Sequence, residues 1–259
     1  MDLGLSGKAA IVTGASKGLG LAIAKELAAE GANVAICSRD AAEIEAAAEA
    51  LRSTGRTIFA RAADVTDPAA VKDFIEGSVA AFGGLDVLVN NAGRAHPGTF
   101  ETLTDEDWQA DLDVKLFSMI RCSRAALPHL RARGGGRIVN INAVFGKYPD
   151  PAFFATSVNR AACLSFTKAL AIELAPDGIL VNSVNIGYVE TPQWERIHER
   201  RAPGLSREEF LRRTAADVPL GRFGTPEEVA AVVAFVVSER ASYLTGTSID
   251  VAGGFGRYL

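Results

Sequence analysis

Residues 9–30 carry the feature that most constrains the fold: an apolar run, a glycine-rich turn and a helical pattern, in that order. Ala9 to Val12 are enough for a buried strand and too few for a helix. Glycines follow at positions 14, 18 and 20, and a helical pattern runs from Leu19 to Glu30. Glycines let a backbone approach a pyrophosphate, and a helix N-terminus points free N–H groups at it. The segment therefore predicts a dinucleotide site.

The rest of the chain repeats the alternation of strands and helices. Further strands are expected at 33–37, 57–61, 86–90, 137–141, 179–184 and 248–251, and helices at 40–54, 68–82, 104–132, 155–175 and from 225. This order predicts an α/β fold, a doubly wound parallel sheet of Rossmann type, in a single domain over residues 1–259. The charged segment at about 190–218 contains no strand pattern, and we expect it to form a substrate lid.

Composition excludes several classes of function. The net charge of −4 gives no basic surface for nucleic acid. No apolar run is long enough to span a membrane, and the N-terminus has no signal-peptide pattern, so a cytoplasmic protein is expected. The three cysteines, Cys37, Cys122 and Cys163, have no CxxC spacing. Only His96 of the three histidines is expected near the site, and we predict no metal site.

Several motifs give a more specific indication. Residues 13–20, Thr-Gly-Ala-Ser-Lys-Gly-Leu-Gly, resemble the TGxxxGxG turn of the short-chain dehydrogenase/reductase family. Asn90-Asn91-Ala92-Gly93 resembles that family's NNAG motif, and Asp64-Val65, Val181-Asn182 and residues 221–228 also stand where the family has them. The resemblance covers about residues 5 to 256. It implies a nicotinamide-dependent oxidoreductase acting on a small molecule, and a homo-oligomer, which we expect to be a tetramer or a dimer.

The end of the second strand bears on the choice of cofactor. An NAD site of this fold has an acidic residue there, which binds the ribose 2′-OH. This chain has Ser38-Arg39 instead, and Arg39 with Lys17 could bind a 2′-phosphate. Both could also be solvated surface charges, but their positions favour NADP(H). From the turn and the resemblance, the predicted cofactor-binding residues are Gly14, Ser16, Lys17, Gly18, Leu19, Ser38, Arg39, Asp64, Val65, Asn91, Ala92, Gly93, Arg160 and Thr191. Asn90 and Asn91 are also expected to tie the fourth strand to its neighbours.

The catalytic positions depart from the family. The family's asparagine, serine, tyrosine and lysine align with Lys115, Ala143, Thr156 and Arg160. A threonine hydroxyl is a much weaker acid than a phenol, and an arginine keeps its proton at any working pH. Arg160 could still bind a ribose hydroxyl. The usual apparatus of proton transfer is therefore absent, whereas the glycine turn that binds the cofactor is intact.

Other groups could supply the proton. Lys115 could point inward, where burial would lower its pKa and make it a proton donor. Alternatively, it points to solvent or pairs with an acid such as Asp111. Tyr148 and Tyr188 lie on loops that face the substrate in this fold, as acids or as apolar walls. The candidate catalytic residues are Lys115, Tyr148, Thr156 and Arg160.

Three functions remain open at this point. The chain could be a reductase of a carbonyl or of an activated C=C bond. It could be a catalytically silent NADP(H)-binding protein or regulatory subunit. It could also be an isomerase or lyase that uses the same pocket.

Overall fold

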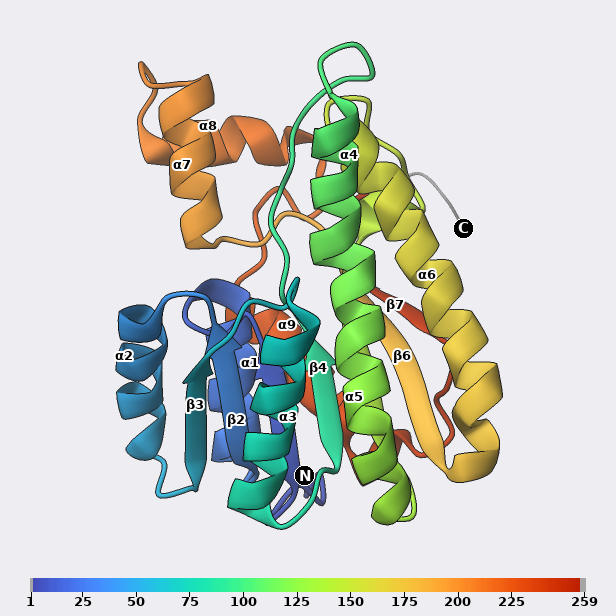
Figure 1. The fold of residues 1–259 in the computed structure, drawn as a ribbon. Coiled ribbons are helices and arrows are strands. Elements are labelled where there is room, and N and C mark those ends of the chain that lie inside the picture. The colour runs from blue at the N-terminus through green and yellow to red at the C-terminus, as the bar shows by residue number, and fades with distance from the viewer. Residues whose placement is uncertain (1, 257–259) are drawn as a thin grey trace.

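A seven-stranded parallel sheet lies between two layers of helices in the computed structural model, which describes residues 2–256 (Figure 1). The strand order is β3-β2-β1-β4-β5-β6-β7. The strands are β1 Ala9–Thr13, β2 Asn33–Ser38, β3 Ile58–Ala62, β4 Val87–Asn90, β5 Gly136–Ala143, β6 Ile179–Ile186 and β7 Ser248–Val251. This confirms the predicted fold class, although residues 1 and 257–259 of the predicted domain lie outside the described residues.

Strand β1 is the point at which the winding of the sheet reverses. It pairs with β2 on one side and with β4 on the other. Connections leave the carboxyl ends of these strands toward opposite faces, which opens a crevice where parallel sheets of this kind bind ligands. The predicted glycine turn follows β1, and the NNAG motif begins at the last residue of β4. The topology thus brings the two motifs to one place.

Each face of the sheet is covered by helices, and their apolar sides form two cores. Helices α1 Gly18–Ala29, α2 Ala41–Arg52 and α9 Pro226–Val237 cover one face. Helices α3 Pro68–Phe82, α5 Ser118–Ala132 and α6 Phe154–Leu174 cover the other. The central strands are buried on both sides, which explains why β1, β2 and β4 read as continuous apolar runs rather than alternating ones.

Local capping chemistry fixes the helix starts that the sequence predicted. The Asp67 carboxylate accepts a hydrogen bond from the Ala69 N–H, and Pro68 occupies the first position of α3. Thr104 and Asp107 form a reciprocal capping box at the start of α4, Asp105–Leu112. Both predictions are confirmed.

The long helix expected at 104–132 is not a single α-helix. Helix α4 passes into a π-helical turn, Asp113–Phe117, and then into α5. A π-turn inserts an extra residue into the helical register, and such turns often occur at functional sites. Lys115 lies in the middle of this turn, and its side chain is buried.

The charged segment after β6 folds into two short helices, α7 Pro192–Arg201 and α8 Arg207–Thr214. They stand beyond the carboxyl ends of the strands, beside the loop that leads into α4 (Figure 1). A bridge between Val189 and Gly224 joins the ends of this segment. Among residues 2–256, no helix has the length and apolar character to cross a membrane.

Candidate functional site

The glycine turn after β1 is packed too closely for larger residues. Gly14 has a φ of +65°, and a Cβ atom built on it would lie 2.8 Å from the Cα of Ala92. A Cβ on Gly20 would overlap the Gly14 carbonyl oxygen and the Asn91 amide. The turn after β1 and the motif after β4 therefore lie in direct contact, and glycine is required at their junction.

Asparagine and threonine side chains hold this junction together. Asn91 Nδ2 donates to the carbonyl oxygens of Thr13 and Gly14, at 2.9 and 3.0 Å. Thr13 Oγ1 accepts from the backbone N–H groups of Asn91 and Ala92, at 3.0 and 3.1 Å. Asn90 Nδ2 donates to Asn140 Oδ1 on β5 at 2.8 Å. The predicted role of Asn90 and Asn91 in tying β4 to its neighbours is confirmed.

The N-terminus of α1 could hold a phosphate. Its N-cap residue, Lys17, makes no side-chain capping hydrogen bond, so no side chain of the cap competes for the first N–H groups of the helix. Gly18 has a φ of +57°, and a Cβ on it would lie 3.5 Å from the Cβ of Thr191. The structure thus brings Thr191, at the start of α7, to the glycine turn. This arrangement fits a pyrophosphate.

The two cationic side chains expected to bind the 2′-phosphate differ in their surroundings. Arg39 is exposed after β2. Lys17 Nζ is bound to Glu43 Oε1 on α2 at 2.6 Å, and Ser16 Oγ donates to the other oxygen of Glu43 at 3.2 Å. Lys17 and Ser16 hold the pKa of the Glu43 carboxyl below its ordinary value, with the Lys17 hydrogen bond as the largest cause. The Glu43 carboxylate therefore binds two of the side chains that were expected to bind the cofactor, Lys17 and Ser16.

The remaining predicted cofactor residues line the neighbouring strand ends or support them. Asp64, which follows β3, accepts hydrogen bonds from the backbone N–H and the hydroxyl of Thr66 at 2.9 and 2.8 Å. Ser38 Oγ donates to the carbonyl oxygen of Asp40 at 3.2 Å. Val65 and Leu19 are buried apolar side chains. The structure shows what these four residues contact within the protein, and their contacts with the cofactor stay predictions.

Lys115 is the centre of the second half of the site. Its side chain is only 1% exposed, and its ammonium group is paired with the fully buried Asp111 carboxylate one turn earlier. Lys115 Nζ also donates to Thr156 Oγ1 on α6 at 3.1 Å. The sequence left open whether Lys115 points inward or pairs with Asp111, and the structure shows both. The ion pair is what allows the lysine to be buried.

The surroundings of Lys115 act on its pKa in opposite directions. Burial lowers it most, and the charge of Arg160 on α6 lowers it further. Asp111 raises it, as does Cys163, but the result is a pKa lowered from 10.5 to about 8. At neutral pH the amine is thus protonated and can lose its proton far more readily than a surface lysine.

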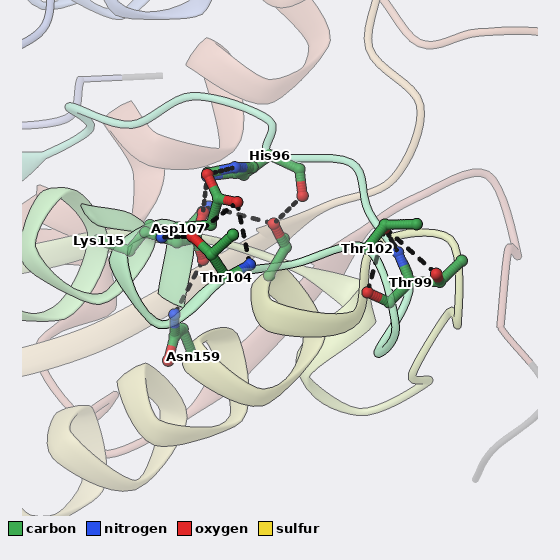
Figure 2. Close-up of polar contacts among 9 residues, drawn as sticks. His96, Thr99, Thr102, Thr104, Asp107, Lys115 and Asn159 are labelled. Atoms are coloured by element: carbon green, nitrogen blue, oxygen red, sulfur yellow. Dashed lines mark hydrogen bonds and ion pairs between the residues drawn. The ribbon is translucent and has the colours of Figure 1, made fainter. Parts of the chain in front are cut away.

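A chain of polar groups extends from Lys115 toward the surface (Figure 2). Asp111 Oδ2 accepts from Asn159 Nδ2 at 2.9 Å. On the loop after β4, His96 Nε2 lies 3.1 Å from Asp107 Oδ1, and His96 Nδ1 lies 3.9 Å from Asp111 Oδ1. Thr156 Oγ1 donates to the His96 carbonyl oxygen at 3.4 Å. The network therefore connects α4, the π-turn and α6 with the rim loop.

Arg160 lies between the two halves of the site. Its Nη1 donates to the Ile141 carbonyl oxygen at 2.9 Å, and a Cβ on Gly93 would lie 3.2 Å from its Nη2. Its Nε is a buried donor with no hydrogen-bond partner. Burial is the main cause that lowers its pKa from the usual arginine value, but the group remains a cation at neutral pH. Arg160 can therefore offer a donor and positive charge to a bound ligand beside Gly93.

The two tyrosines considered as acids belong to an aromatic cluster rather than to the Lys115 network. Tyr148 packs edge-on against Phe255, with ring centroids 5.9 Å apart. Tyr188 packs against Trp194 of α7 and against Phe223, at 5.3 and 5.4 Å. Burial is the main cause that raises the pKa of Tyr188 above 10. These contacts favour the apolar-wall interpretation, and a catalytic role for Tyr148 stays a prediction.

Sequence reasoning missed some members of the site. Asn159 stands one turn before Cys163 on the buried side of α6, and nothing local marks it as a ligand of Asp111. Glu43 is 26 positions from Lys17, too far for a local pattern. Asp111 was identifiable as a partner, because an acid four positions before a lysine faces it on a helix. Within residues 2–256, no group of three or more His, Cys, Asp or Glu side chains is placed to hold a metal ion.

Comparison with known proteins gives consistent matches. A family model described as enoyl-(acyl carrier protein) reductase matches residues 14–256. The putative ketoacyl reductase of the monensin polyketide synthase from Streptomyces virginiae is 40% identical over 255 residues, which are 97% of this chain and 98% of that protein. These matches extend across almost the whole of each chain.

Two solved structures are similar throughout. L-Sorbose reductase from Gluconobacter frateurii, complexed with NADPH and L-sorbose, has a TM-score of 0.95 and 35% identity, with all of both chains covered. An NADPH-bound short chain oxidoreductase from Pseudomonas aeruginosa PAO1 is described as containing an atypical catalytic center. It has a TM-score of 0.92 and 39% identity over 98% of this chain and 99% of that one.

Proposed function

Because the chain is an oxidoreductase of the short-chain dehydrogenase/reductase family, we propose that it reduces a carbonyl with NADPH and takes the proton from Lys115. In this proposal the family's tyrosine is replaced by a pair, the Thr156 hydroxyl and the Lys115 ammonium group. The observation that carries it is the buried Lys115 Nζ, 3.1 Å from Thr156 Oγ1. The pKa of Lys115 is lowered to about 8, which suits proton donation.

The cofactor is NADP(H), and the cradle fits it. Glycine at position 14 lets the turn after β1 pack directly against Ala92 of the motif after β4, where a Cβ atom would not fit. The start of α1 offers its N–H groups to the pyrophosphate, and Arg39 and Lys17 are the cations for the 2′-phosphate. The solved relatives bound to NADPH support the same choice. When bound, reduced nicotinamide supplies the hydride.

Lys115 and Thr156 deliver the proton in this scheme. As hydride adds to the carbonyl carbon, the Thr156 hydroxyl gives its proton to the developing alkoxide. The Thr156 oxygen takes a proton from Lys115 in the same step, which leaves an alcohol and a neutral amine. Arg160 stays protonated and holds the cofactor side of the pocket through its open Nε.

A carbonyl fits this arrangement better than an alkene. Reduction of a carbonyl needs a proton at the oxygen that receives the negative charge, and the Lys115–Thr156 pair is built to supply one. Hydride addition to an activated C=C bond instead gives an enolate, whose charge lies on the oxygen of the activating group and whose α-carbon takes the proton, so no acid is needed beside the carbon that receives the hydride. The ketoacyl reductase and the sorbose reductase among the relatives point in the same direction.

The test combines cofactor binding with a small panel of substrates. NADPH and NADH are titrated first, and the NADPH complex is then mixed with L-sorbose, an acetoacetyl thioester and a crotonyl thioester. We expect tighter binding of NADPH and loss of its absorbance with a carbonyl compound. Tight binding without oxidation by any of the three would overturn the proposal in favour of a silent NADP(H)-binding protein, and conversion without net NADPH loss would favour an isomerase or lyase.

Matched variants test the assignment of the acid. Thr156→Val removes the hydroxyl at similar volume, whereas Thr156→Ser keeps it, so we expect kcat to fall at least about 100-fold only in the first. Lys115→Met alone would leave the Asp111 carboxylate buried without a counter-ion. The double variant Lys115→Met/Asp111→Asn avoids this and should lose turnover while its NADPH Kd stays within about twofold of the wild type. Full turnover in the double variant contradicts the role of Lys115.

A further inference from the structure

His96 has an arrangement that the proposed reaction does not yet use. It lies on the loop between β4 and α4, and its side chain is 20% exposed. Its two ring nitrogens face two different carboxylates: Nε2 faces Asp107 on the surface side, and Nδ1 faces the fully buried Asp111. Nδ1 is itself buried and has no hydrogen-bond partner. A buried polar nitrogen without a partner is costly and calls for an explanation.

After each proposed turnover, the buried Lys115 amine must be protonated again. Each turnover leaves Lys115 as a neutral amine, and its side chain is only 1% exposed. Water has little direct access to it, because it is surrounded by the side chains of Asp111, Asn159, Thr156, Arg160 and Cys163. A second turnover requires a proton to be brought back from solvent.

We propose that His96 returns this proton to Lys115 by way of Asp111, an inference that rests on the proposed function. One atom, Asp111 Oδ1, faces both His96 Nδ1 and Lys115 Nζ. The imidazolium gives the Nδ1 proton to Asp111 Oδ1, and the same carboxyl passes a proton to the Lys115 amine. Asp111 ends unchanged, Lys115 regains its charge, and His96 becomes neutral.

His96 is then recharged from solvent. Loss of the Nδ1 proton leaves the neutral ring with its proton on Nε2, so the ring turns over and brings Nδ1 to the solvent side beside Asp107, whose side chain is 39% exposed. There Nδ1 takes a proton from hydronium or a buffer acid, and the ring turns back. Asp107 is kept ionised, because the backbone N–H of Thr104, more than any other group, holds the pKa of its carboxyl below the ordinary value. Histidine is the side chain best suited to gain and lose a proton in neutral solution.

The resting geometry requires a small movement. The 3.9 Å between His96 Nδ1 and Asp111 Oδ1 is about 1 Å longer than a normal N–H···O hydrogen bond. Residues 91–97 have no regular secondary structure, and loops of this kind move more easily than helices. Rotation of the ring toward Asp111 closes the gap, and the Asp107 contact holds the other end. His96 thus acts on the reaction through Lys115, as a positioning and relay residue.

The experiment compares one turnover with many, at pH 7, where Lys115 starts protonated. In the single-turnover arm, enzyme with one equivalent of NADPH is mixed with an excess of the carbonyl probe that the wild type reduces fastest. The steady-state arm uses excess NADPH in a dilute buffer. For His96→Gln we expect steady-state kcat to fall about tenfold while the single-turnover rate stays within about twofold of wild type. In His96→Ala, added imidazole should restore most of the steady-state rate.

His129→Gln is the matched control. His129 on α5 is similarly half-buried and faces a carboxylate, with Nε2 3.6 Å from Glu76 Oε1. It is not a member of the polar network around Lys115. It should leave both rates unchanged and show no response to imidazole.

Other outcomes separate the relay from the proposed function. An unchanged steady-state rate in His96→Gln overturns the relay. Equal slowing of both arms without imidazole rescue assigns His96 a merely structural role and also overturns it. A normal single-turnover rate in Lys115→Met/Asp111→Asn, or no oxidation of NADPH by any carbonyl in the wild type, overturns the proposed function itself.

Discussion

Lys115 owes its suitability as an acid to a balance between burial and charge. Burial and Arg160 lower its pKa, while Asp111 keeps the ammonium form from being lost altogether. Without Asp111, a lysine so deeply buried would favour the neutral amine and could not donate a proton at pH 7. Without burial, its pKa would be near 10.5, too high for ready donation. The pair therefore gives an acid that is both charged and able to react.

This balance predicts the pH dependence of the reaction. The reacting form of Lys115 is protonated, so activity is present below the pKa and lost as pH rises through it. We expect kcat for carbonyl reduction to begin falling near pH 8 and then to decline about tenfold per pH unit. Steady-state rates between pH 6 and 10 check this, with NADPH binding measured in parallel to exclude loss of cofactor. A rate that stays level to pH 10 is incompatible with Lys115 as the acid.

Glu43 is the second residue whose charge has a predictable effect. Its carboxylate holds Lys17 and Ser16, and a bound 2′-phosphate would have to displace it or lie beside it. Glu43→Gln removes the competing charge, so the Kd for NADPH should decrease roughly two- to fivefold, the effect expected of an exposed ion pair. The Kd for NADH, which has no 2′-phosphate, should barely change.

The control for this titration lies on the same helix. Glu45 on α2 pairs with Arg52 instead of Lys17, so Glu45→Gln alters the surface charge equally without freeing a cofactor group. It should have little effect on either Kd. Equal effects of Glu43→Gln on NADPH and NADH would mean that Glu43 does not compete with the 2′-phosphate.

At the scale of elements, the parts that the sequence predicted are those with a local physical cause. The apolar runs, the glycines of the first turn and the caps at Asp67 and Thr104 each act over a few residues, and the structure has the expected element at each. The strand ends were less accurate. β5 and β6 each continue two residues beyond the predicted ends, to Ala143 and Ile186, because pairing between the two strands extends them.

The π-turn had no such local cause. Nothing in residues 113–117 distinguishes them from an ordinary helix, and one α-helix was expected there. The contacts that accompany the turn come from elsewhere: Thr156 and Asn159 on α6 bind Lys115 and Asp111, more than 40 positions away in sequence. The same reason explains why Glu43 was missed. Local patterns predicted the scaffold, and the resemblance to the family placed the four candidate catalytic positions, but the partners of those positions follow from tertiary packing.

At the scale of the whole molecule, one flank of the sheet has features of an interface. Strand β7 is the last in the sheet, so one of its edges pairs with no other strand of the sheet. Helix α6 packs on the neighbouring strand β6 (Figure 1). It exposes two large apolar side chains, Val158 and Ile172. Ile172 is 68% exposed. Apolar side chains on an outer helix beside an open sheet edge are typical of a surface that a second copy covers.

We therefore expect a homo-oligomer, a tetramer or a dimer, with α6 in one of its interfaces. Ile172→Glu places a charge in this interface, and burying an unpaired charge strongly opposes association. Sedimentation equilibrium should show a wild-type particle of several chain masses and a smaller one for Ile172→Glu. Phe235→Glu is the control, because Phe235 is 40% exposed on α9, which covers the opposite face of the sheet from α6. A wild type that sediments as one chain would contradict the predicted oligomer. An Ile172→Glu particle of unchanged mass would show that Ile172 lies outside the interface.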